Sequence, residues 1–193
     1  MKDKYFIGIF ATIIVLGIFF FIILTISPKP VVTESETIPT KFIIDSLEIK
    51  RNNEIRKKEQ ERRDSCFISE IKQRISIKYY SSAPNSAGGV DFHLSYKNLS
   101  NKEIKYFYIT LGFLNAVGDF VDSEIGGRSV FRCKDTGPIK FHQYGGGTWE
   151  NVIYNYSAKY PDIFEIEIEY MDGSTFKIPT NFIKYVPGYK KRK

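Results

Sequence analysis

Residues 90–172 contain a series of short segments in which apolar and polar side chains alternate, and turn residues close each segment. The first segment, 90–98, has the period of two that is typical of a strand with one buried face. The last, 164–170, ends just before Asp172-Gly173, a strong signal for a short hairpin. No long helical pattern separates these segments. The sequence therefore predicts a mainly β domain, a single antiparallel β-sandwich over residues 65–189.

Periodicity and turn residues also predict where the individual strands lie. The expected strands cover residues 74–80, 90–98, 102–115, 120–125, 129–133, 140–142, 149–156, 164–170 and 175–178, and 181–186 would extend the last hairpin. Residues 136–139 are expected to form a turn because they contain Gly and Pro. The glycine run 145–147 is expected to be a flexible turn, since it lacks the Lys and Ser or Thr of a phosphate-binding loop.

Residues 5–27 form an almost wholly apolar run with no charged side chain. A helix of this length crosses a hydrocarbon core of about 30 Å. The run exceeds the apolar region of a cleaved signal peptide, and no A-x-A-like cleavage site follows it. We therefore expect a retained signal anchor, a single-pass transmembrane helix of the bacterial cytoplasmic membrane. Its two basic flanks are nearly equal, so the orientation rests on the export role of a first apolar segment. The expected orientation places residues 1–4 in the cytoplasm and the sandwich outside the cytoplasmic membrane.

Between the anchor and the sandwich the composition changes twice. Residues 28–40 are rich in Pro and are expected to form an extended linker. Residues 41–64 contain no Gly or Pro and are expected to form a charged helical stalk, with favourable charge pairs four residues apart. The stalk is interpreted as a solvated helix with one end packed. The alternative is a short self-associating coil, although its heptads are not sustained.

The chain of 193 residues has a formal net charge of +6, and much of the surplus lies in the stalk and in a basic tail at 190–193. Such a balance suits anionic lipid, an acidic envelope polymer or nucleic acid without choosing among them. The sandwich itself is closer to balanced, and no nucleic acid is expected as a partner. No motif places a nucleophile beside a base, so the sequence predicts a protein that is not an enzyme and holds no cofactor.

Two cysteines, Cys66 and Cys133, flank the first half of the expected sandwich. In an oxidising compartment they could form a disulfide, which would contribute about 4 kcal/mol in the chain-entropy model. The alternative is two free thiols, one or both buried. Neither cysteine lies in a CxxC pair, and the chain has only two histidines, which argues against a zinc site.

Several short motifs carry a family resemblance. Asn98-Leu-Ser-Asn-Lys102, then Ile104-Lys-Tyr-Phe-Tyr-Ile109, then Phe113-Leu-Asn115 with Gly118-Asp119 resemble the FxLYD-type immunoglobulin-like domain of small bacterial membrane-anchored envelope proteins. Asn115 stands where the family has a Tyr-Asp pair. The resemblance covers residues 74–178 and implies an extracytoplasmic immunoglobulin-like sandwich, with no catalytic residue.

Five side chains form the predicted binding surface: Trp149, Tyr144, Glu165, Glu167 and Glu169. A lone tryptophan most often anchors a sandwich core, and alternating glutamates most often face solvent, but the glutamates could also meet a basic partner. Five tyrosines are numerous enough that some must be exposed, which suits contact with protein or glycan: Tyr79, Tyr80, Tyr106, Tyr108 and Tyr144.

The predicted function is a membrane-anchored binding or assembly module that contacts a protein partner, or another copy of itself, in a cell-envelope complex. The alternative is a sensor domain that binds a small ligand or a glycan on its aromatic face. A flat apolar patch would favour the first function, and a pocket with convergent polar groups the second.

Overall fold

The computed structural model of the chain describes residues 40–190, with side chains from residue 46 onward. The chain divides into two compact units, Met1–Arg51 and Asn52–Lys193, and the fold below is that of the second. The predicted anchor at 5–27, nearly all of the linker and most of the basic tail lie outside the described residues. Within residues 40–190, no helix combines the length and the apolar character that crossing a membrane requires.

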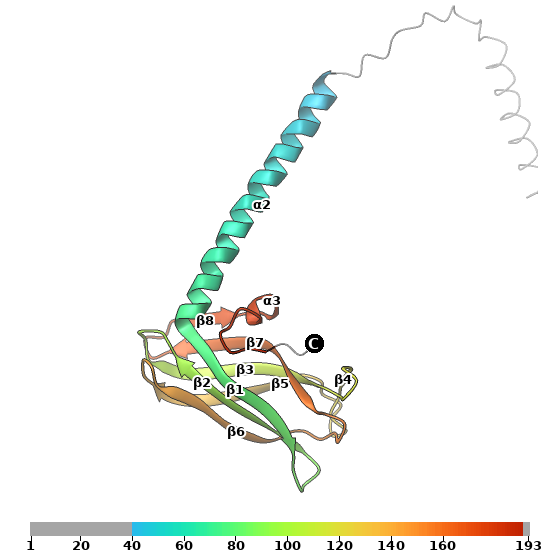
Figure 1. Ribbon diagram of the computed structural model, residues 1–193, viewed down its shortest axis with the longest axis vertical. Helices are drawn as coiled ribbons and strands as arrows, with labels where there is room; N and C mark the ends of the chain where they lie inside the picture. The colour runs from blue at the N-terminus through green and yellow to red at the C-terminus, as the bar shows by residue number, and fades with distance from the viewer. Residues whose placement is uncertain (1–39, 191–193) are drawn as a thin grey trace, which may run out of the picture. The chain divides into compact units, whose positions relative to one another are not determined.

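The described chain is mainly β, with two antiparallel sheets that share one core (Figure 1). In chain order the elements are α2 (Thr40–Arg74), β1 (Ile75–Pro84), β2 (Val90–Asn98), β3 (Ile104–Leu114), β4 (Phe120–Val121), β5 (Phe131–Ile139), β6 (Tyr144–Ile153), β7 (Tyr160–Tyr170), β8 (Thr175–Ile178) and α3 (Thr180–Ile183). One sheet has the order β1-β2-β6, and the other has the order β4-β3-β7-β8, with β5 also paired to β3. This arrangement agrees with the predicted β-sandwich.

Alternation along the strands builds the core. Every second residue of β2 is buried, from Val90 to Asn98, as the period of two predicts. In the facing sheet, β3 contributes Phe107, whose ring stacks on that of Tyr96 with centroids 3.9 Å apart. Burying an aromatic side chain of this kind stabilises the fold by roughly 1.5–3 kcal/mol.

The last turns of α2 belong to the core and not to a stalk. The helix continues to Arg74, ten residues beyond the predicted end at residue 64. Phe67 packs against Phe176 of β8 and Phe182 of α3, at centroid distances of 5.6 and 4.9 Å, and Ile71 is fully buried. Phe67 and Ile71 are four residues apart and so share one helix face. Their burial explains why the helix runs on into the domain.

The turn after β2 is held by a buried asparagine. The Asn98 side-chain amide donates to the carbonyls of Lys102 and Ile139, at 2.8 and 2.9 Å. Its oxygen accepts from the Ser100 backbone N–H and hydroxyl, at 3.0 and 2.8 Å. All four hydrogen-bonding positions of the amide are therefore used. This network gives a physical reason for the Asn-x-Ser turn that begins the motif resembling the FxLYD-type domain.

Two predicted turns lie inside strands. Residues 136–139 belong to β5, whose pairing with β3 is irregular at residues 137–138, and an edge strand tolerates a proline at such a bulge. Residues 145–147 belong to β6, where a Cβ on Gly145 would lie only 2.6 Å from Cζ of Tyr96. Glycine there allows close approach of strand and ring, so the prediction of a flexible turn was wrong. Residues 181–186 do not extend the last hairpin, since α3 begins at Thr180.

Side chains join the two sheets where β5 meets β6, along what we call the sealed edge. Asp135 of β5 accepts from the Tyr96 hydroxyl at 2.9 Å and from the Gly146 backbone N–H at 2.7 Å. Trp149 of β6 donates its indole N–H to the Lys134 carbonyl at 3.0 Å. Hydrogen bonds that involve a charged group are the stronger kind. The sealed edge is therefore fixed by polar contacts as well as by apolar packing.

Candidate binding groove

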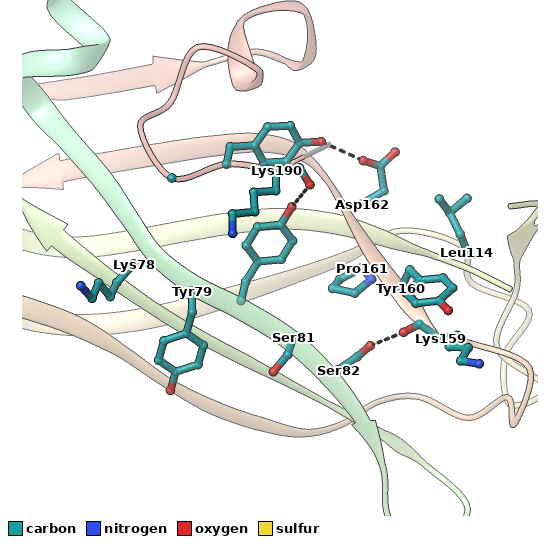
Figure 2. Close-up of a pocket in the computed structure, with 13 residues that line it drawn as sticks. Lys78, Tyr79, Ser81, Ser82, Leu114, Lys159, Tyr160, Pro161, Asp162 and Lys190 are labelled. Atoms are coloured by element: carbon teal, nitrogen blue, oxygen red, sulfur yellow. Dashed lines mark hydrogen bonds between the residues drawn. The ribbon is translucent and has the colours of Figure 1, made fainter. Parts of the chain in front are cut away.

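A groove of about 470 Å³ lies between β1 and the start of β7, opposite the sealed edge (Figure 2). Its wall includes the C-terminal segment after α3. The side chains used below are Lys78, Tyr80, Ser82, Lys159, Asp162 and Tyr189. We call this feature the groove.

The sequence of β1 explains why the sheets do not close here. A bulge between Ile77 and Tyr79 shifts the register of β1 on β2. Before the bulge, β1 buries the aliphatic side chains Ile75 and Ile77. After it, Tyr80 and Ser82 lie opposite the buried residues of β2 and so face inward. Tyr80 and Ser82 do not fill the space between the sheets as Ile75 and Ile77 do before the bulge. A polar, open hollow therefore remains.

The C-terminal segment is anchored to β1 and forms one wall. The Ile77 backbone N–H donates to the Pro187 carbonyl at 2.8 Å. Gly188 follows with φ of +84°, and a Cβ there would collide with the Ile77 carbonyl oxygen. Glycine is required at this position to bring the chain across the strand.

Two tyrosines stack inside the groove. The rings of Tyr80 and Tyr189 lie 5.9 Å apart at an angle of 6°. The Tyr80 hydroxyl donates to the Lys190 carbonyl at 2.7 Å, and the Tyr189 hydroxyl donates to Asp162 Oδ1 at 3.1 Å. Burial is the main cause that raises the pKa of both phenols, and the negative charge of Asp162 adds to it. Both hydroxyls are therefore protonated donors at neutral pH.

Basic side chains line the groove without acidic partners. Among the described residues, none of Lys78, Lys159 and Lys190 forms an ion pair. The Lys159 ammonium lies 5.7 Å from the Tyr160 ring centroid, and the Lys159 carbonyl accepts from the Ser82 hydroxyl at 2.9 Å. Asp162 is the one acidic residue in the lining. The lining is thus aromatic and carries a positive excess.

The groove continues along β1 toward the turn that follows β3. A second hollow of about 680 Å³ shares Ser82, Lys159 and Tyr160 with the first. It extends to residues 115–117, in the turn after β3, and to Tyr156. Together the two hollows form an elongated site along the second half of β1, which suits an extended ligand better than a compact one.

Trp149 and Tyr144 of the predicted binding surface lie elsewhere. Trp149 is half-buried at the sealed edge and stacks on Phe92 at 5.8 Å, so it acts as a core anchor. Tyr144 is 58% exposed, and the Lys97 ammonium lies 5.6 Å from its ring centroid. Neither residue lines the groove.

The three glutamates of β7 are paired within their own sheet. Glu165 forms an ion pair with Lys177 at 3.0 Å, Glu167 with Arg132 at 3.0 Å, and Glu169 with Lys105 at 2.7 Å. The cations come from β8, β5 and β3. The structure therefore does not bring the five predicted surface residues together, and the glutamates do not form an unpaired acidic patch.

Both cysteines are free thiols, which is the second of the two alternatives that the sequence left open. Cys66 is exposed on α2, whereas Cys133 of β5 is buried opposite Ile109 of β3. Burial raises the pKa of the Cys133 thiol to about 12. Within the described residues, no group of three His, Cys, Asp or Glu side chains is placed to hold a metal ion.

Sequence reasoning missed most of the groove. It included Tyr79 and Tyr80 among five tyrosines of which some would be exposed, but it did not name Ser82, Lys159, Asp162 or Tyr189. These residues come from three segments far apart in the chain, and no local motif connects them. The tyrosine pair in 79–80, directly after an aliphatic alternation, is the one local signal of a change in lining.

No family model, curated protein or solved structure matches this chain. The resemblance to the FxLYD-type domain therefore stays a prediction from the motifs.

Proposed function

We propose that this protein is a membrane-anchored, extracytoplasmic binding module without catalytic activity, which holds an extended segment of a protein partner in the groove. The observation that carries the proposal is an elongated hollow, lined by aromatic rings and polar groups, beside an edge strand. Concave sites that combine aromatic surface with a few placed polar groups are the usual form of binding sites.

The groove is a hollow with polar groups and not the flat apolar patch expected for a protein partner, but the free side of β1 favours a polypeptide over a small ligand. Ile77 is hydrogen-bonded to the C-terminal segment, but beyond it no backbone hydrogen bond reaches the outer side of β1 through Pro84 among the described residues. An exposed strand edge presents donors and acceptors that an added strand can pair. The side chains of such a strand would alternate between the groove and the outer surface.

The cellular setting of the proposal rests on the sequence. The apolar run at 5–27 supports a single membrane anchor, and the helix that follows supports a stalk between anchor and domain. The motifs resembling the FxLYD-type domain support an immunoglobulin-like sandwich outside the cytoplasm. The partner would then be another envelope protein or a second copy of the chain.

Site-directed photo-crosslinking in intact cells tests the proposal. A benzoylphenylalanine replaces either Tyr79, which is 54% exposed on β1, or Tyr144, which is 58% exposed on β6 of the same sheet. We expect a crosslinked adduct of defined mass from position 79 only. Adding Ser82→Trp, which fills the groove, should abolish that adduct while circular dichroism stays unchanged. Equal adducts from both positions, or no effect of Ser82→Trp, would contradict the proposal.

A glycan is the second candidate, because tyrosine rings and hydroxyls line the groove. A sugar would stack on the Tyr80 and Tyr189 pair, and its binding would depend on these rings more than on the strand edge. Retention of the full chain on neutral polysaccharide, lost in Tyr189→Ala and kept in Tyr144→Ala, would favour this candidate over a peptide.

A further inference from the structure

From the charges that line the groove we infer that the bound segment is an acidic, extended peptide that pairs with β1 as an added strand. The inference rests on the proposed function and specifies the chemistry of the partner.

The charge balance of the groove differs from that of the nearby sheet surface. Three lysines line it, and the single acidic residue, Asp162, already accepts a hydrogen bond from Tyr189. On β7, only a few residues further along the chain, every one of the three glutamates has a cationic partner. Cations with no acidic partner in residues 40–190, beside an aromatic hollow, leave a positive potential that an anionic ligand would complement.

The positions of the lysines indicate an elongated anion. Lys78 and Lys159 lie at opposite ends of the labelled residues in Figure 2, and Lys190 lies between them. The Lys190 carbonyl accepts from the Tyr80 hydroxyl. A single phosphate could contact one of these ammonium groups but not both ends of the groove. A chain with several carboxylates could contact all three.

Among anionic ligands, the exposed edge of β1 favours a peptide. An added strand forms hydrogen bonds to the free side of β1, and its side chains point alternately to the two faces. Apolar side chains on one face would meet the Tyr80 and Tyr189 rings, while carboxylates on the other would lie near the lysines at the rim. The geometry therefore predicts alternating acidic and apolar residues in the segment.

The test uses the full chain in detergent micelles and a fluorescent peptide of about eight alternating glutamate and valine residues, long enough to span about 26 Å. We expect saturable binding that weakens as sodium chloride is raised, because added salt screens the charges. A lysine–valine peptide of equal length should bind at least about tenfold more weakly.

Lysine variants test which positive charges contribute to the affinity for the acidic peptide. Lys159→Gln should weaken binding about threefold, and the double change Lys78→Gln with Lys159→Gln about tenfold, as expected for exposed ion pairs. Lys140→Gln is the matched control, since Lys140 is exposed and does not line the groove, and it should leave binding unchanged. Equal effects of all three changes would overturn the inference.

Two further probes separate strand pairing from charge alone. A glutamate–valine peptide with alternate backbone amides methylated should lose binding, because it cannot complete the hydrogen bonds of an added strand. Undiminished binding of that peptide would overturn strand addition. Polygalacturonate supplies carboxylates without a peptide backbone. If it binds with the same lysine dependence while the peptides do not, the ligand class is an anionic glycan and the inference is wrong.

The result also separates this inference from the proposed function. If a neutral threonine–valine peptide binds as tightly as the acidic one and blocks crosslinking at position 79, the groove is a peptide site and only the acidic specificity is overturned. If no peptide binds and position 79 gives no adduct in cells, the proposed function fails as well.

Discussion

Along the sealed edge, side chains link the two sheets directly, whereas along the β1 side a groove separates them. Asp135 and Trp149 bridge β5 and β6 through hydrogen bonds to neighbouring strands. At the groove, Tyr80 and Tyr189 bond mainly to the C-terminal segment and to Asp162. The polar groups of the sealed edge therefore connect the two sheets, whereas those of the groove fix mainly the C-terminal segment and leave a hollow, which we propose receives a partner. Four predictions test this division, ordered by the size of the expected effect.

Trp149→Ala should have the largest effect on stability. It removes a half-buried ring stacked on Phe92 and the hydrogen bond to the Lys134 carbonyl. We expect a loss of about 3 kcal/mol in the free energy of unfolding, at the low end for aromatic truncation. Tyr144→Ala on the same strand is the control and should cost under about 0.5 kcal/mol. Urea denaturation measures both, and similar losses would contradict the structural role assigned to Trp149.

Asp135→Asn should cost less, about 2 kcal/mol, because the amide keeps one acceptor but loses the charge that strengthens the bonds from Tyr96 and Gly146. Asp162→Asn is the matched change at the groove, where the carboxylate accepts from one tyrosine hydroxyl. It should cost at most about 0.5 kcal/mol. A larger loss at Asp162 than at Asp135 would reverse the assignment of the two edges.

Alkaline pH should destabilise the sealed edge through Tyr96. Burial, together with the charge of Asp135, raises the pKa of Tyr96 far above its ordinary value of 10.0. Above pH 10 the unfolded chain releases this proton while the folded chain keeps it, so stability falls as pH rises. The slope contributed is about 1.4 kcal/mol per pH unit.

Tyr96→Phe should remove that slope, although it also lowers stability at neutral pH through loss of the hydrogen bond to Asp135. Urea denaturation between pH 9 and 11 measures the slope. Burial and Asp162 also raise the pKa of Tyr189, so Tyr189→Phe at the groove should remove a slope of its own over the same pH range. An unchanged slope in Tyr96→Phe would show that another group controls alkaline unfolding.

The rate of thiol labelling should report how readily the sealed edge opens in the folded protein. At neutral pH a maleimide should react quickly with exposed Cys66 and slowly with Cys133, because burial shields the latter and raises its pKa to about 12. Mass spectrometry should find one label per native chain and two after unfolding. Trp149→Ala should speed the second reaction, since Cys133 lies on β5 beside the sealed edge. Rapid double labelling of the native protein would mean that this edge opens readily.

Sequence patterns located the regular parts of the fold well. The predicted strands 90–98 and 175–178 have the bounds of β2 and β8 because a clean alternation ends at turn residues on both sides. The error at 145–147 arose because glycine was interpreted as flexibility, whereas the packing of Tyr96 requires its small size. The helix was ended too early because Phe67 and Ile71 were assigned to the sandwich, although their spacing of four is a helical signal.

The candidate site was harder to predict for a topological reason. The glutamates of β7 are conspicuous in the sequence, but their cationic partners lie on other strands and become visible only after pairing. The groove residues, in contrast, are inconspicuous in the sequence. Ser82, Lys159 and Tyr189 form no motif and come together only in the folded chain. A run of like charges is therefore weaker evidence for a site than the absence of partners in the folded chain.

The junction between α2 and β1 has a mechanical consequence. The helix ends at Arg74 and the strand begins at Ile75, with no connecting loop. Phe67 and Ile71 also fasten the end of the helix to the domain. A partner bound at β1 would pull on a strand that is continuous with the helix. Because no loop lies between them, the tension would pass directly along the backbone. If a partner binds at β1 as proposed, this junction should pass the load to the helix directly.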